Sequence, residues 1–141
     1  MHVEIGCGSG GYLQAWASRH PQDAFLSFEL RFKRITLAAR KLAQAQLTNA
    51  LLIKDRGELL GEYLSEKNLD ILHVNFPDPW PKKAHQKHRL FSREFLDQLL
   101  ILFREGGEIR FKTDHQEYFL MVLELLPVSY THLRAHETVD Y

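Results

Sequence analysis

Short apolar runs alternate along this chain with stretches in which apolar residues recur at helical spacing. We predict strands at residues 2–5, 24–29, 50–53, 70–75 and 108–112, and helices at residues 11–19, 32–42, 59–64, 95–103 and 118–125. Strands separated by helices form a parallel sheet, and right-handed crossovers place helices on both of its faces. The pattern therefore predicts an α/β fold with a doubly wound, mostly parallel sheet of five strands, and a ligand site beyond the carboxyl ends of the strands.

The composition is that of an ordinary folded domain. The 141 residues are 45% hydrophobic and 26% charged, which excludes a collagen, a low-complexity polymer and a disordered tail. The one cysteine, Cys7, excludes an internal disulfide framework and a multi-cysteine zinc site. No window approaches the ~18 consecutive apolar residues of a membrane span, and the chain begins in a strand-like run rather than a signal peptide. We therefore expect a cytoplasmic protein without membrane contact, whose balance of 18 basic and 18 acidic residues favours no class of partner.

A glycine-rich turn, EIGCGSGG, follows the first predicted strand. Gly6, Gly8 and Gly11 fit the G-x-G-x-x-G pattern between a strand and a helix, where glycine lets the backbone approach a ligand closely. A tight turn without a ligand has the same pattern. Glu4 precedes the first glycine, and a carboxylate there suits the ammonium and sulfonium groups of S-adenosylmethionine better than a dinucleotide phosphate.

Two further acids end predicted strands. Glu29 follows the second strand, where a carboxylate accepts hydrogen bonds from ribose hydroxyls. Asp55 ends the third strand, in LLIKD, and is either a ligand contact, a surface aspartate or a helix N-cap. Because both NAD and S-adenosylmethionine carry a ribose, Glu29 indicates a nucleoside cofactor and is compatible with either of them.

The loop after the fourth strand, NFPDPWPKK, is the most distinctive segment of the chain. Prolines on both sides of Asp78 restrict the backbone, and Trp80 follows directly. A carboxylate fixed in this way at the carboxyl edge of the sheet is a preorganised polar site. The alternative is a rigid loop in which Trp80 only fills the core.

A run of cations without an intervening acid comes next, and we call it the basic strip: Lys82, Lys83, Lys87, Arg89 and Arg93. Five positive charges within twelve residues of a neutral protein favour an anionic partner, of which a phosphate backbone is the most obvious. A solvated loop is the simpler explanation for most charge runs. His85 and His88 lie among the cations, but they have no nearby cysteine or third ligand, so we expect no metal site.

Two helix starts are predicted from capping patterns. Ser92 is a candidate N-cap, with Phe91 and Leu96 at the positions of a hydrophobic staple. Asp114 ends the fifth strand in Lys-Thr-Asp, and Glu117 three residues later fits a capping box. Asp114 can therefore be a cap, a ligand contact at the same sheet edge, or both.

Together, EIGCGSG, FLSFEL, NFPDPWPKKAHQKHRL and FKTDHQEYFLMVLE, in this order, resemble the bacterial tRNA (guanine-N7-)-methyltransferase family over residues 2–126. The resemblance implies a class I fold that binds S-adenosylmethionine and methylates a guanine of tRNA, usually at position 46 in the variable loop. It also implies roles for individual residues: cofactor contacts from Glu4, Gly6, Gly8, Glu29, Asp55 and Asp78, catalysis by Asp78, and substrate contacts from Lys82 and Asp114.

Both ends depart from the family pattern. An N-terminal extension and two further strands with a Thr-x-x-Glu segment are missing. Residues 127–141, PVSYTHLRAHETVDY, carry no clear helical or strand period and resemble translated adapter sequence. We therefore expect an incomplete methyltransferase core at residues 1–126 and a foreign or disordered tail at 127–141. We expect a monomer or a homodimer.

Three alternatives remain at this point. A class I methyltransferase that acts on a nucleobase amino group has a similar loop after its fourth strand, but lacks the inserted Asp78. An inactive fragment that binds RNA through the basic strip is the second. A nicotinamide dehydrogenase is the least favoured, because no Tyr-x-x-x-Lys motif is present.

Overall fold

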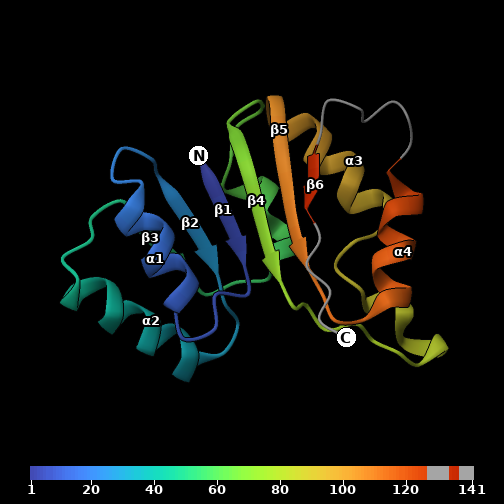
Figure 1. Cartoon of the computed structure of the whole chain (residues 1–141), viewed down its shortest axis with the longest axis horizontal. Coiled ribbons are helices and arrows are strands. Elements are labelled where there is room, and N and C mark those ends of the chain that lie inside the picture. The colour runs from blue at the N-terminus through green and yellow to red at the C-terminus, as the bar shows by residue number, and fades with distance from the viewer. Residues whose placement is uncertain (127–133, 137–141) are drawn as a thin grey trace.

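The computed structural model of the chain describes residues 1–126 and, for the backbone, 134–136 (Figure 1). Its centre is a sheet of six parallel strands in the order β3-β2-β1-β4-β5-β6. The strands are β1 (His2–Ile5), β2 (Phe25–Phe28), β3 (Ala50–Ile53), β4 (Leu69–Asn75), β5 (Phe103–Lys112) and β6 (Arg134–His136). The strand order reverses direction between β1 and β4, so the carboxyl ends of these two strands form the switch point at which α/β sheets bind ligands.

Helices lie between successive strands. They are α1 (Gly11–Arg19), α2 (Phe32–Gln44), α3 (Arg93–Leu102) and α4 (Gln116–Leu125), with 3₁₀ helices η1 (Gly57–Glu62) and η2 (Lys83–His88). The carboxyl ends of the strands, α2 and η2 all lie at the lower side of Figure 1. The alternation predicted from the sequence is therefore confirmed, although the predicted helix at 59–64 is a 3₁₀ helix over slightly earlier residues.

Alternate residues of each strand face two different layers, as the period of a strand requires. Val3, Phe28 and Phe111 belong to the larger apolar cluster, to which η1, α3 and α4 also contribute. Phe25 belongs to a smaller cluster with Leu13 of α1 and residues of α2. Helices thus cover both faces of the sheet, which confirms the doubly wound arrangement.

The boundary between α3 and β5 differs from the prediction. The apolar stripe predicted a helix through residue 103, but Phe103 is already extended, with φ −68° and ψ 137°, and begins β5. Phe103 pairs with Leu69 of β4, and an irregularity then shifts the register before Ile71 pairs with Glu108. Phe103 is buried although it lies in the strand, so hydrophobic spacing alone does not separate the end of the helix from the start of the strand.

The sheet also has one strand more than predicted. Residues 134–136 pair with β5 in parallel, Glu108 facing Arg134, and form β6 within the segment that the sequence analysis placed in an irregular tail. The prediction of a disordered tail is therefore wrong for these three residues only. The rest of 127–141 lies outside the described residues, and the foreign origin of that segment stays a prediction.

Candidate active site

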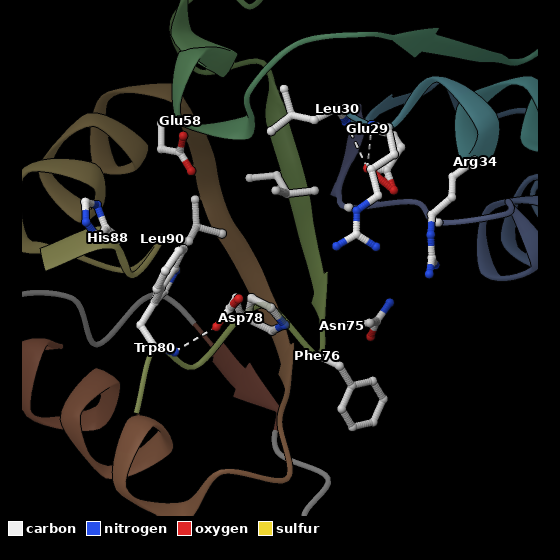
Figure 2. A pocket seen from close by; sticks show the side chains of 15 residues that line it. Glu29, Leu30, Arg34, Glu58, Asn75, Phe76, Asp78, Trp80, His88 and Leu90 are labelled. Atoms are coloured by element: carbon white, nitrogen blue, oxygen red, sulfur yellow. Dashed lines mark hydrogen bonds between the residues drawn. The ribbon is translucent and has the colours of Figure 1, made fainter. Parts of the chain in front are cut away.

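A pocket of about 480 Å³ opens at the carboxyl edge of the sheet, beyond β1, β2 and β4 (Figure 2). Gly6 and Gly8 come from the turn after β1, Glu29 from the end of β2, and Asp78 from the loop after β4. These four predicted site residues, separated by up to about seventy positions in sequence, therefore line one cavity. Its volume lies within the ~300–1,000 Å³ that is typical of small-molecule sites.

The glycine turn is shaped by conformations that other residues rarely adopt. Gly6 has φ 81° and lines the pocket with open space where a Cβ atom would be. Gly10 has φ 90°, and a Cβ there would lie 2.7 Å from the Cβ of Ala38, because α1 and α2 approach closely at this point. Glycine at position 10 thus permits the helix packing, whereas glycine at position 6 leaves backbone exposed to a ligand.

Glu29 is held by the backbone that follows it. Its Oε2 accepts a hydrogen bond of 2.8 Å from the amide of Leu30 and a longer one of 3.5 Å from the amide of Arg31. The half-buried carboxylate is therefore oriented at the mouth of the pocket. Its other oxygen, Oε1, has no hydrogen bond within the described residues and is available to a donor such as a ribose hydroxyl.

The loop that carries Asp78 is strained. Phe76 and Trp80 have φ values of 52° and 43°, in the left-handed region that bulky side chains avoid. Asp78 Oδ1 accepts a 2.9 Å hydrogen bond from the amide of Trp80, which fixes the turn between them. Figure 2 shows this contact and the exposed Asp78 carboxylate at the pocket. Backbone strain of about 1–3 kcal/mol per residue persists where the surrounding structure enforces it, and such residues cluster at functional sites.

The buried side chain of Arg89 holds this loop in place through a hydrogen bond to its backbone. Its side chain is only 1% exposed, and its Nε donates a 2.6 Å hydrogen bond to the carbonyl of Pro79. The guanidinium also pairs with Glu117 of α4 and lies 4.8 Å from the ring centroid of Tyr118. Arg89 was predicted as part of the exposed basic strip. That prediction is wrong, because the ion pair and the carbonyl contact draw this residue into the protein.

The other members of the basic strip remain at the surface. Lys83 and Lys87 are exposed on η2, Lys82 is exposed directly before it, and Arg93 is exposed at the start of α3. His88 lines the pocket, and its ring centroid lies 5.0 Å from that of Trp80. Four exposed cations thus border the loop that carries Asp78.

Glu4 does not line the pocket. It is 3% exposed within β1, and its Oε1 accepts a 2.7 Å hydrogen bond from the hydroxyl of Ser27 on β2. Burial raises the pKa of Glu4 to about 7. Burial likewise raises the pKa of the neighbouring Cys7 thiol to about 11, so this cysteine is not a nucleophile at neutral pH. The predicted contact between Glu4 and the cofactor stays a prediction.

Asp55 lines a smaller cavity of about 120 Å³ that shares Gly6 and Glu29 with the main pocket. Its carboxylate accepts hydrogen bonds from the hydroxyl of Tyr63, at 2.6 Å, and from the amide of Arg56, at 2.7 Å. These two contacts, the tyrosine first, lower the pKa of Asp55. The acid is therefore ionised at neutral pH and lies beside the Glu29 end of the site.

Lys82 and Asp114 lie outside both cavities. Asp114 is exposed and is not the N-cap of α4. His115 takes that place, with its Nδ1 accepting a 3.1 Å hydrogen bond from the amide of Tyr118, while Glu117 pairs with Arg89 instead of closing a capping box. The predicted cap is wrong by one residue, because α4 begins one residue later than the capping pattern requires and places His115 at the N-cap. The Ser92 cap is confirmed, since its hydroxyl accepts from the amide of Phe95 at 3.1 Å.

Sequence reasoning missed three charged residues of the pocket. Arg31 and Arg34 line it from the start of α2, and Glu58 lines it from η1. The arginines follow Glu29 by two and five residues, so the spacing contained a usable signal. Glu58 follows no motif, and only the fold brings it to the site.

The part of the chain that the structure describes has no helix long and apolar enough to cross a membrane. In residues 1–126, no group of three or more histidine, cysteine or acidic side chains is arranged to hold a metal ion.

A family described as "Putative methyltransferase" matches residues 1–140. The chain is 39% identical, over 119 residues, to a tRNA (guanine-N(7)-)-methyltransferase of Enterococcus faecalis, with 84% of this chain and 56% of the relative covered. It is 38% identical, over 138 residues, to a bifunctional glycosyltransferase/methyltransferase of Fusobacterium nucleatum, covering 98% of this chain and 21% of that protein. The chain therefore spans about half the length, or less, of these curated relatives.

Solved structures share the fold at low identity. An rRNA methylase from Streptococcus thermophilus superposes with a TM-score of 0.65 and 17% identity, covering 90% of this chain and 69% of that one. A SAM-dependent methyltransferase from Aquifex aeolicus gives 0.56 and 15%, covering 74% and 50%. With a family match over nearly its whole length and this fold, the chain belongs to the methyltransferase family that matches residues 1–140.

Proposed function

We propose that the chain binds S-adenosylmethionine in the pocket at the carboxyl edge and transfers its methyl group to N7 of a guanine in tRNA. The observation that carries the proposal is the convergence of Gly6, Glu29 and Asp78 on one pocket, with exposed lysines beside it. Relatives named tRNA (guanine-N(7)-)-methyltransferase, at 33–39% identity, support the choice of substrate.

The pocket fits this cofactor. Glu29 offers a free carboxylate oxygen to the ribose hydroxyls, and the open backbone at Gly6 offers room beside it. Asp55 lines the adjoining small cavity, and we assign to it the contact with the adenine amino group. When bound, S-adenosylmethionine supplies an electrophilic methyl group on a positively charged sulfur.

The proposed reaction requires little from the protein beyond positioning and charge. Guanine N7 has a lone pair and no proton to lose, so no strong general base is required and alignment supplies most of the rate. The methylated ring is cationic, and the Asp78 carboxylate at the pocket is placed to stabilise the positive charge as it develops. The rigid turn between Asp78 and Trp80 holds that carboxylate in place before the reaction.

Substrate selection falls to groups at the rim. A carboxylate accepts from both guanine N1–H and the N2 amino group, a pattern that no other RNA base offers, and we assign this role to Asp114 or Asp78. Lys82 and its exposed neighbours are assigned to the phosphates of the tRNA. The protein acts as a monomer or homodimer in the cytoplasm on this proposal.

The test is to incubate the protein with S-adenosylmethionine and an unmodified tRNA transcript, and then to identify the methylated nucleoside. We expect 7-methylguanosine, detected by borohydride reduction and aniline cleavage of the RNA chain. Methylation of an exocyclic amine would instead assign the protein to the other nucleobase methyltransferases. Absence of both methylation and S-adenosylhomocysteine binding in calorimetry would contradict the proposal.

A further inference from the structure

The segment of the chain that contains α2 has an unusual charge pattern. No acidic residue occurs between Glu29 and Asp55, whereas five cations occur within eleven residues: Arg31, Lys33, Arg34, Arg40 and Lys41. All but the half-buried Lys41 are exposed, and Lys41 donates to the hydroxyl of Ser9. Within residues 1–126, none of the five forms an ion pair with a carboxylate.

The three cations at the amino end of α2 do not stabilise the helix. Arg31 is the N-cap of α2, Lys33 and Arg34 lie in its first turn, and no acid offsets them there. The amino end of a helix carries a partial positive charge, so cations at this end are unfavourable. The arrangement therefore gathers positive charge at the start of α2 without a benefit to the helix.

An open groove accompanies the cations on the outer surface of α2. Phe32, Lys33, Thr36, Leu37 and Arg40 line a hollow of about 290 Å³. Phe32 is 70% exposed and Leu37 46% exposed. An exposed aromatic ring between cations is the combination by which proteins bind nucleic-acid strands, with bases on the ring and phosphates on the cations.

The groove and the candidate active site are lined by neighbouring residues of one segment, although they share none. Phe32 and Lys33 of the groove lie in sequence between two arginines of the pocket. Arg31 and Arg34 line the pocket, and Arg34 Nη1 lies 3.5 Å from the position a Cβ of Gly8 would take. Figure 2 shows Arg34 on the Glu29 side of the pocket and Trp80 with His88 on the other. Basic surfaces on α2 and on η2 thus flank the pocket from two sides.

We propose that the outer face of α2 binds the substrate RNA, with Lys33 and Arg40 on its phosphates and Phe32 against a base or ribose. The inference rests on the proposed function and extends it. RNA would then cross the mouth of the pocket, held by α2 on one side and by the basic strip on the other. A protein partner is less favoured, because the groove is rimmed by unpaired cations rather than by a continuous apolar surface.

The test measures the affinity for an unmodified tRNA transcript by fluorescence anisotropy over a range of salt concentrations. The double variant Lys33→Gln/Arg40→Gln should bind about tenfold more weakly near physiological salt. Its plot of log K against log salt should be flatter by about 1.4 to 1.8 units, the contribution of two phosphate contacts. The matched control is Lys67→Gln/Arg104→Gln, which removes two exposed cations beside the amino ends of β4 and β5 and should leave the slope unchanged.

Phe32→Ala tests the aromatic contact separately. It should weaken RNA binding about 5- to 160-fold, as the loss of one stacked base does, without altering the salt slope. Leu51→Ala is the control, since Leu51 is 67% exposed on β3, away from the groove. The two α2 variants and the two control variants should all bind S-adenosylhomocysteine with wild-type affinity in calorimetry, which shows that they are folded.

Wild-type RNA affinity and salt slope in the α2 variants would overturn the inference. If such variants still form 7-methylguanosine, the proposed function survives this failure. If the wild-type protein forms none, the proposed function fails, and the anisotropy data alone decide whether α2 binds RNA. A change of oligomeric state in the α2 variants, with unchanged RNA affinity, would instead make this face a contact between copies of the chain.

Discussion

Arg89 and Glu117 join the loop after β4 to helix α4 through a short ion pair, with Nη2 of the arginine 2.5 Å from Oε2 of the glutamate. The same guanidinium donates to the carbonyl of Pro79, the residue that follows Asp78. The position of Asp78 therefore depends on a contact between segments 28 residues apart in sequence. This link explains how a loop with strained residues at positions 76 and 80 keeps one conformation.

Glu117→Gln should destabilise the protein at neutral pH. The Arg89 side chain is 1% exposed and would lose its counter-charge, while Glu117 is 58% exposed, so we expect a loss of about 1–2 kcal/mol in unfolding free energy. The hydrogen bond from Arg89 lowers the pKa of Glu117. Its stabilising effect is therefore complete above the unfolded pKa and is lost as pH falls through the lowered folded value.

Urea denaturation at pH 7 and at pH 3 tests this prediction. The difference between wild type and variant should shrink at the lower pH. Glu66→Gln, at an exposed position, should change the unfolding free energy by less than about 0.5 kcal/mol at either pH. A difference that does not depend on pH would show that the charge of Glu117 is irrelevant to Arg89.

Glu4→Gln should change the pH dependence of stability in the opposite direction. Burial raises the pKa of Glu4 from 4.5 to about 7, so folding opposes its ionisation. The wild-type protein consequently loses stability as pH rises from about 4 to 8. The variant should gain about 3 kcal/mol relative to wild type over this range, which is 2.5 pKa units converted to free energy. If the unfolding free energies of wild type and variant depend on pH in the same way, in thermal or urea unfolding, the raised pKa of Glu4 is contradicted.

Glu29→Ala should weaken the binding of S-adenosylhomocysteine by about 1–3 kcal/mol, because buried donors of the ligand would lose their acceptor. Isothermal titration calorimetry measures this directly. Glu62→Ala, at an exposed position of η1 outside the pocket, is the control and should bind with wild-type affinity. Unchanged affinity in the Glu29 variant would remove this residue from the cofactor site.

Lys83→Gln/Lys87→Gln should reduce the salt dependence of tRNA binding. Both lysines are exposed on η2, and the loss of two phosphate contacts should flatten the plot of log K against log salt by about 1.4 to 1.8 units. An identical slope in wild type and variant would make the basic strip an ordinary solvated surface.

Much of the fold was predictable because local patterns and tertiary structure agree. The period of the strands, the helical stripe after Ser92 and the glycine turn each determine an element with little help from the rest of the chain. The grouping of Gly6, Glu29 and Asp78 also followed, since parallel strands bring their carboxyl ends to one edge.

Several of the predictions that failed concern contacts between distant segments. A run of cations gives no sign that Arg89 alone is buried, because its partner Glu117 lies on another element. The same holds for a buried polar chain beneath α1, in which His73 contacts the Tyr12 hydroxyl at 2.8 Å and His2 at 3.0 Å. Burial lowers the pKa of His73 to about 3, an outcome that no local pattern in β4 indicates.

The role of Asp78 in catalysis is the central claim, and the rate of tRNA methylation by Asp78→Asn tests it most directly. Asparagine keeps the acceptor for the Trp80 amide but removes the charge that balances the cationic product. The account predicts a kcat about 10²–10³-fold lower, the usual effect of losing one preorganised electrostatic partner, with a smaller loss of S-adenosylhomocysteine affinity because Glu29 remains. A variant that forms 7-methylguanosine with wild-type kcat would contradict it.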